Sequence, residues 1–311
     1  MEDVKDFESF YTIKIYPYVK EFERKEQAAA NWKNFTLSTG ISAVICFILF
    51  HFKKFPSGAL LAAAMLLMCI TGIYFFTKYA DSYIDDFKEK IIGQIITYIY
   101  PAAVYKPMGF VSKKEYKASG LYRRKFTHFD GDDYWESVIN GLSFHCSEIE
   151  SSYNDPAGSE SIFKGLFFTV KLNALLSGGT YIWSKDNVQL PGSMADEHYR
   201  MYYLPGIKKY PTNDPSFNRI YSVYTTNAGE ASLILTRSML EHMLLIRQKL
   251  KKEIVFSFVG GSCYVAVPFN ENLLEPTKKG IRDKMAIRNY FYTILLVFNI
   301  IKKLQLHRLG S

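Results

Sequence analysis

The sequence predicts an α+β protein, in which an N-terminal two-helix transmembrane hairpin with cytoplasmic helical extensions precedes a mainly antiparallel β domain with packed helices. Three observations lead to this prediction. Two long uncharged apolar runs follow one another near the N-terminus, alternating apolar and polar residues appear after about residue 100, and an apolar helical pattern lies near the C-terminus. Spacing separates the two kinds of element, because side chains repeat about every 3.6 residues in a helix and every 2 in a strand.

The hairpin is predicted from residues 34–52 and 55–77, which contain no Asp, Glu, Lys or Arg. At about 1.5 Å per residue these runs extend about 28 and 34 Å, close to the roughly 30 Å of a bilayer's hydrocarbon core. We therefore predict spans over about 34–52 and 56–77, within a hairpin of residues 34–77. The alternative is a pair of core helices. Only a tight turn fits between the runs, so the helices are expected to be antiparallel.

The orientation follows from the basic residues that flank the spans, because cytoplasmic flanks are enriched in Lys and Arg. Seven basic residues lie on the side of the termini, against Lys53 and Lys54 in the loop: Lys20, Arg24, Lys25, Lys33, Lys78, Lys88 and Lys90. We predict a multi-pass protein of the cell (inner) membrane with both termini in the cytoplasm.

Apolar stripes flank the spans on the side of the termini. Residues 1–33 are predicted to be an amphipathic helical segment, in which Pro17 starts or kinks a helix. Residues 78–100 place Ile and Phe at helical intervals and are predicted to form a helical stalk. The two stripes are expected to pack on each other, the alternative being a helix that lies on the lipid surface.

Residues 101–311 are predicted to form a soluble α+β domain with a C-terminal helix over 281–306 that packs on the sheet or the stalk; a re-entrant or interfacial helix is the alternative. Thr236 is the expected N-cap of a further helix, and residues 185–215 look irregular. Gly178-Gly179 and Gly260-Gly261 are read as hairpin turns. The predicted strands are Ser143–Glu150, Leu166–Leu172 (half-buried), Thr180–Trp183, Arg219–Thr226, Ala231–Leu235, Ile254–Val259 and Ser262–Val267.

A series of short motifs resembles a bacterial family of uncharacterised two-span membrane proteins, which is defined by a domain of unknown function. The motifs run in order over about residues 100–275 and include Tyr105-Lys106-Pro107, Phe129-Asp130-Gly131-Asp132-Asp133, Phe163-Lys164-Gly165-Leu166, Asp214-Pro215-Ser216-Phe217 and Tyr264-Val265-Ala266-Val267-Pro268. Arg237 stands where family members often have Pro. The resemblance implies the two-span architecture and no activity, since the family has no established one.

The sequence offers few candidates for chemistry. The glycine pairs lack the spacing of phosphate-binding loops, and the six histidines are scattered, so no catalytic and no cofactor-binding residue is predicted. The four cysteines show no disulfide or zinc spacing. Asp130, Asp132 and Asp133 are candidate metal ligands, because oxygen atoms at alternate positions suit Ca²⁺ or Mg²⁺. The alternative is a turn in which these carboxylates accept hydrogen bonds from backbone amides.

The chain carries a net charge of +8. Its basic residues form local clusters at Lys113-Lys114, Arg123-Arg124-Lys125, Lys249-Leu250-Lys251-Lys252 and Lys278-Lys279. Such a domain beside a membrane favours anionic lipid as a partner. The sequence thus predicts a membrane-tethered cytoplasmic module that contacts the lipid bilayer and binds a protein or lipid partner in the membrane or cytoplasm. No nucleic acid is expected, because no nucleic-acid-binding signature occurs. The alternative is a membrane-bound, metal-dependent enzyme that uses the Asp130–Asp133 region.

Overall fold

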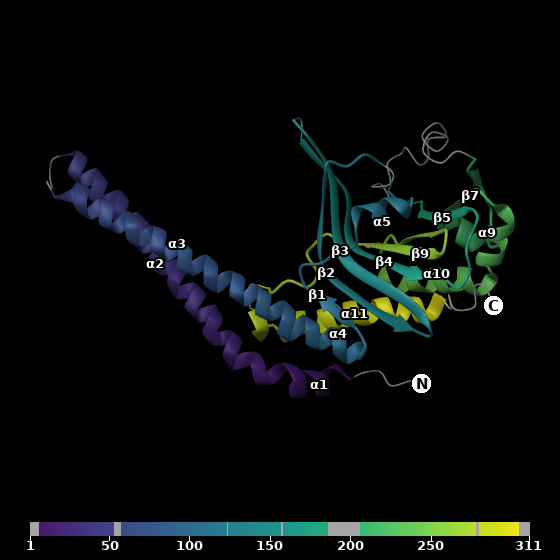
Figure 1. Cartoon of the computed structure of the whole chain (residues 1–311), viewed down its shortest axis with the longest axis horizontal. Helices are drawn as coiled ribbons and strands as arrows, with labels where there is room; N and C mark the ends of the chain where they lie inside the picture. Colours follow the sequence, from purple (N-terminus) through teal and green to yellow (C-terminus); the bar gives the residue numbers. More distant parts are fainter. Residues whose placement is uncertain are drawn as a thin grey trace. The chain divides into compact units, whose positions relative to one another are not determined.

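The computed structural model describes residues 6–52, 57–122, 124–156, 158–185, 206–277 and 280–304 (Figure 1). The loop lysines Lys53 and Lys54, the basic residues Arg123, Lys278 and Lys279, and most of the predicted irregular segment lie outside these ranges. The chain forms two compact units. The helical unit comprises Met1–Gln94 and Glu275–Asn289, and the sheet unit comprises Ile95–Leu274 and Tyr290–Ser311.

The predicted hairpin is confirmed in the helical unit, where α2 (Val19–His51) and α3 (Gly58–Phe87) lie side by side (Figure 1). The helical stretches Phe7–His51 and Gly58–Ile99 are long and apolar enough to cross a membrane, with mean hydropathies of 1.5 and 2.3 in their most apolar windows. Only 11% and 6% of those windows are buried. Helices of a protein core are mostly buried, so this exposure favours lipid contact over the core-helix alternative.

Small side chains let the two helices approach closely. A Cβ added at Gly72 would lie 2.5 Å from Thr36 Oγ1 and 3.3 Å from Thr36 Cα, so only glycine fits there without displacement. One turn before Gly72, the Cys69 thiol donates to the Thr36 carbonyl at 3.5 Å. Ala43 and Ala62 are also buried in this seam. Small residues of this kind are common where membrane helices pack, because they bring the backbones together.

Beyond the predicted spans, charged and aromatic side chains of α2 contact those of α3 and of the residues that follow α3. Lys25 pairs with Asp86, and Lys90 Nζ lies 2.7 Å from Glu21 Oε1. The ring of buried Phe22 lies against Phe87, with centroids 6.2 Å apart. The predicted packing of the two flanking stripes is therefore confirmed within this unit.

The N-terminal flank is interrupted where Pro17 lies. A short helix α1 (Phe7–Phe10) passes into a π-helical turn, Tyr11–Ile15, and then a 3₁₀ turn, Tyr16–Tyr18, before α2 begins. Proline cannot donate the i→i−4 bond that a continuous helix needs, which agrees with the predicted kink. The other flank continues from α3 through the π-helical turn Lys88–Ile92 into α4 (Gly93–Ile99).

A C-terminal segment completes the helical unit. It contains a 3₁₀ turn, Gly280–Arg282, and the start of α11 (Lys284–Leu304). Three ion pairs join it to the N-terminal helices: Lys88–Glu275 at 2.7 Å, Arg282–Glu26 at 3.1 Å and Lys284–Glu8 at 2.6 Å. Lys88 is only 3% exposed, so its pair is the buried one.

In the sheet unit, the described residues contain nine strands in one sheet of order β1-β2-β3-β4-β9-β8-β5-β7-β6, and every neighbouring pair is antiparallel. The mainly antiparallel α+β prediction is thus confirmed. The strands are β1 (Val104–Lys106), β2 (His128–Ile139), β3 (Leu142–Asp155), β4 (Gly158–Lys171), β5 (Gly179–Ser184), β6 (Lys208–Lys209), β7 (Tyr221–Thr225), β8 (Val255–Val259) and β9 (Ser262–Pro268).

Helices cover both faces of this sheet. α5 (Lys113–Ala118) lies on one face, and α10 (Arg237–Leu250) and α11 lie on the other (Figure 1). The central strand β4 is therefore buried on both faces from Leu166 to Val170, and the predicted half-buried strand is wrong in that respect. The predicted C-terminal helix is confirmed up to Leu304, and in the sheet unit its Ile294 and Phe298 contact Tyr100.

Three local predictions are corrected. Ala231–Leu235 is not a strand: residues Ala228–Ile234 form helix α9, which Asn227 caps. Helix α8 (Pro215–Ile220) replaces the first two residues of the strand predicted from Arg219. Gly178-Gly179 is not a hairpin turn, because β4 pairs with β9 whereas β5 pairs with β7 and β8. The Gly260-Gly261 hairpin between β8 and β9 is confirmed.

Candidate functional site

The three predicted metal ligands lie on β2 rather than in a turn. Asp130 is opposite Glu150 and Asp132 opposite Glu148 across the β2–β3 pair, so four carboxylates occupy one face of the hairpin. Like charges in these positions are unfavourable unless other groups compensate them. Compensation comes from Lys164 Nζ, which lies 2.9 Å from Glu150, and from the Leu273 amide, which donates to Glu148 at 3.0 Å.

Asp133 occupies a β-bulge, where the register of β2 shifts. Its φ of 53° is left-handed, a conformation that costs most residues about 1 kcal/mol but that Asp tolerates. The bulge is held by the Asp133 amide, which donates to the Pro107 carbonyl at 2.8 Å, and by the Tyr105 hydroxyl, which donates to Asp133 Oδ1. The side chain is fully buried.

The structure brings together two of the three predicted ligands. Carboxylate oxygens of Asp132 and Asp133 lie within 4.8 Å of each other. Asp130 is exposed, and its carboxylate instead accepts a bond from the Gly131 amide at 2.9 Å. Two carboxylates can supply part of the oxygen shell of a Ca²⁺ or Mg²⁺ ion, whereas Asp130 accepts its backbone bond within β2 and not in the predicted turn.

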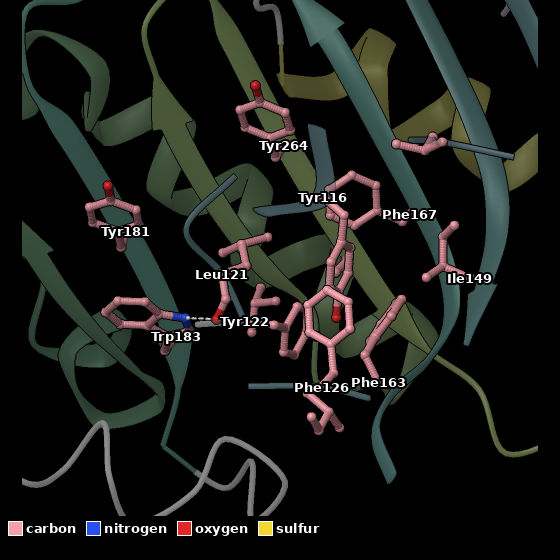
Figure 2. Close-up of a cluster of buried hydrophobic side chains, with 14 of the residues drawn as sticks. Tyr116, Leu121, Tyr122, Phe126, Ile149, Phe163, Phe167, Tyr181, Trp183 and Tyr264 are labelled. Atoms are coloured by element: carbon pink, nitrogen blue, oxygen red, sulfur yellow. Dashed lines mark hydrogen bonds between the residues drawn. The ribbon is translucent and has the colours of Figure 1, made fainter. Parts of the chain in front are cut away.

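Helix α5 forms a second polar feature, on the opposite face of the sheet. It has six residues, too few to be stable alone, so its contacts hold it in place. Ser112 caps it by accepting from the Glu115 amide at 3.2 Å. Tyr116 is buried in the core beneath it, where its hydroxyl lies 2.9 Å from Ser151 Oγ and its ring stacks on Tyr122 (Figure 2).

Glu115 provides the charged contact of α5 with the sheet, in addition to the Tyr116–Ser151 contact. Its Oε1 lies 2.8 Å from His145 Nε2 on β3. His145 is opposite Thr169 on β4, whose fully buried Oγ1 approaches the carboxylate but makes no hydrogen bond of normal geometry. Burial alone would raise the pKa of Glu115, but the bond and the charge of His145 outweigh it and the pKa lies below its ordinary value.

Sequence reasoning missed this Glu115–His145 contact, because 30 residues separate the partners. One local signal was present. Ser112 and Glu115 have the spacing of a capping box before a helix, which predicts α5 although not its partner.

A pocket of about 430 Å³ lies elsewhere in the sheet unit, between the start of α8, the end of α9 and the start of α10. Its polar wall includes Asp214, whose carboxylate already caps α8, and Arg237, which pairs with Glu241 at 2.9 Å. Its apolar wall includes Leu235 and Leu240. The volume suits a small molecule, but Asp214 already accepts from backbone amides of α8 and Arg237 is already paired with Glu241.

The cysteines are free, as predicted. Cys146 and Cys263 are fully buried, and burial raises the pKa of both thiols, which makes them poor nucleophiles. Of the six histidines, His198 and His307 lie outside the described residues.

Comparison with known proteins adds a family match. Residues 161–306 match the family described as "Protein of unknown function (DUF3137)". The match begins within β4 and so takes in most of the sheet unit and α11, whereas the predicted resemblance also extended to residues 100–160. No curated protein matches the chain.

Among solved structures, the crystal structure of the mycobacterial trehalose monomycolate transport factor A, TtfA, is similar at 11% identity. The alignment covers 68% of this chain and 95% of that chain, with a TM-score of 0.31. A likeness at this score supports no statement about what this chain does.

Proposed function

We propose that this chain is a membrane-tethered module, whose hairpin anchors it in the cell membrane and whose sheet unit binds a protein or lipid partner on the cytoplasmic side. The main support is the exposure of the two apolar helices, only 11% and 6% buried in their most apolar windows. Exposed apolar faces of this length are stable in lipid and unfavourable in water.

The structure of the helical unit supports a tether of some length. From Lys78 to Gln94 the chain continues as helix beyond the predicted second span, which at about 1.5 Å per residue extends roughly 25 Å. Cross-helix ion pairs such as Lys90–Glu21 are favourable in water and costly in lipid, so this part belongs outside the hydrocarbon core.

Affinity purification of the full chain from native membranes tests the proposal. We expect the tagged chain to leave the membrane only with detergent, and a protein or lipid to be enriched with it over an untagged control. A chain found in the soluble fraction contradicts the tether, and a detergent-extracted chain with no enriched partner contradicts the binding role.

A second candidate function rests on the pairing of Asp132 with buried Asp133 at a strained bulge, since strained backbone is common at functional sites. In this reading the chain is a membrane-bound, metal-dependent enzyme. Metal analysis of the purified chain separates the two candidates. Stoichiometric Ca²⁺ or Mg²⁺ that is lost in Asp132→Asn but kept in Asp130→Asn favours the enzyme, and a metal-free chain removes this candidate.

A further inference from the structure

The outward side of α5 carries three lysines, and Lys125 precedes the Phe126 ring that two of them cover. We call these four residues the α5 lysine patch: Lys113, Lys114, Lys117 and Lys125. All four are exposed. Lys113 Nζ and Lys117 Nζ lie over the ring of Phe126, at 4.9 and 5.2 Å from its centroid. Because Phe126 is itself buried at 7% exposure, it fixes where these two ammonium groups lie.

The helix has one inward and one outward side. Glu115 and Tyr116 point to the sheet, where they contact His145 and Ser151. At about 100° per residue, the three lysines of α5 then fall within one arc on the opposite side. Since the inward contacts anchor so short a helix, the lysines form a fixed surface rather than a set of independent side chains.

The patch is not neutralised by the described residues, where no acidic group pairs with any of its four lysines. The neighbouring Arg124 differs, because Glu160 binds it through two charge-assisted bonds. Within the part of the chain that the structure describes, the free charges of the patch are therefore all ammonium groups. Lysine acts as a point charge, whereas the planar fork of arginine selects particular carboxylate or phosphate geometries, so the patch suits a diffuse anionic surface.

We infer that the α5 lysine patch binds the headgroups of anionic lipids. This rests on the proposed function, because a membrane tether holds the sheet unit at a high effective concentration of lipid. Four lysines at an anionic surface each gain favourable electrostatics that fade within a Debye length and weaken with salt. An acidic protein surface is the competing occupant, which the test below separates.

The test uses the full chain in nanodiscs of phosphatidylcholine alone or mixed with phosphatidylglycerol. Acylation of each lysine by a water-soluble reagent is followed by mass spectrometry. We expect the patch lysines to react about fivefold more slowly in the anionic nanodiscs, and to recover their reactivity at high salt. Two exposed control lysines outside the basic clusters should react alike in both lipids: Lys208 and Lys209.

Equal reactivity of the patch lysines in the two lipids overturns the inference. Protection that appears only when a protein partner from native membranes is added overturns it in favour of the acidic protein surface. Since the unaltered chain is used, misfolding of a variant cannot obscure the result. The proposed tether fails separately, by the chain's absence from membranes, so the two failures are distinguishable.

Discussion

At the scale of the residue, Glu115 is the charged link between α5 and the sheet. Replacing it by Gln keeps its shape but removes the charge that faces His145. We expect Glu115→Gln to lower the stability of the sheet unit by about 1.5–3 kcal/mol at neutral pH, the range for a hydrogen bond to a charged group. Thermal unfolding in detergent, followed by Trp135 and Trp183 fluorescence, measures this effect.

The same variant has a defined pH dependence. The pKa of Glu115 is lower in the folded chain than its ordinary value, so ionisation of this carboxyl stabilises the fold above the unfolded pKa. That contribution is lost as the pH falls through the folded pKa. The difference between the original chain and Glu115→Gln should therefore shrink below about pH 4.5. A difference that stays constant from neutral pH to pH 4 contradicts this role.

Two glycines with positive φ form a matched pair. Gly165 has a φ of 146°, and a Cβ there would meet the Val267 carbonyl oxygen on the neighbouring strand. Gly260 has a φ of 58° in the hairpin turn, with nothing within 4 Å of its Cβ. We expect Gly260→Ala to cost about 1 kcal/mol from backbone strain alone, and Gly165→Ala at least about twice as much. Equal losses in thermal unfolding would show that the close strand contact is not limiting.

Single residues were predictable where their effect is local. Thr236 caps α10 as expected, accepting from the Met239 amide at 3.3 Å, and Gly260 supplies the positive φ of a tight turn. The bulge at Asp133 was not predictable, because the Tyr105 hydroxyl and the Pro107 carbonyl that hold it come from a separate segment.

At the scale of the element, the C-terminal segment is held to the N-terminal helices by ion pairs of unequal burial. Glu275→Gln removes a carboxylate from Lys88, whose side chain is 3% exposed, and should cost up to about 3 kcal/mol. Glu8→Gln removes the partner of Lys284 from a pair that is about half exposed, and should cost less than about 1 kcal/mol.

A double variant separates charge burial from simple loss of packing. If the buried ammonium causes the penalty, Lys88→Met combined with Glu275→Leu should recover much of the stability that Glu275→Gln loses. A double variant as unstable as the sum of its single variants would mean that packing, and not charge, holds this segment.

Elements were predictable where a pattern continued over many residues, as in the two apolar helices of the hairpin, the second half of β4 and the C-terminal helix. The predictions failed where turn-forming residues or a short alternation of apolar and polar residues suggested the wrong kind of element. Strand β2 was not predicted, because its Asp-Gly-Asp-Asp sequence is typical of a turn. Around α9, the apolar residues Ala231, Leu233 and Leu235 alternate as in a strand. The buried residues are instead Ala231, Ile234 and Leu235, which have helical spacing, and Leu233 is 73% exposed.

At the scale of the whole molecule, the chain combines an apolar hairpin with an antiparallel sheet, which has nine strands in the described residues. Sequence patterns could predict this combination, because lengths of apolar runs and alternation are properties of continuous segments. They left open whether the C-terminal helix packs on the sheet or on the stalk, since the association of residues 275–289 with the N-terminal helices depends on ion pairs between segments about 200 residues or more apart.

The central claim is that the hairpin spans the membrane with the sheet unit on the cytoplasmic side. The native Cys146 and Cys263 cannot report it, because both are fully buried. Two exposed positions can: Ser57 beside the loop of the hairpin, and Leu233 on α9. Sealed right-side-out membrane vesicles bearing Ser57→Cys or Leu233→Cys are treated with a membrane-impermeant maleimide. With the sheet unit on the cytoplasmic side, we expect Ser57→Cys to be labelled at once and Leu233→Cys only after detergent is added. Labelling of Leu233→Cys in sealed vesicles, or equal labelling of both variants, would contradict it.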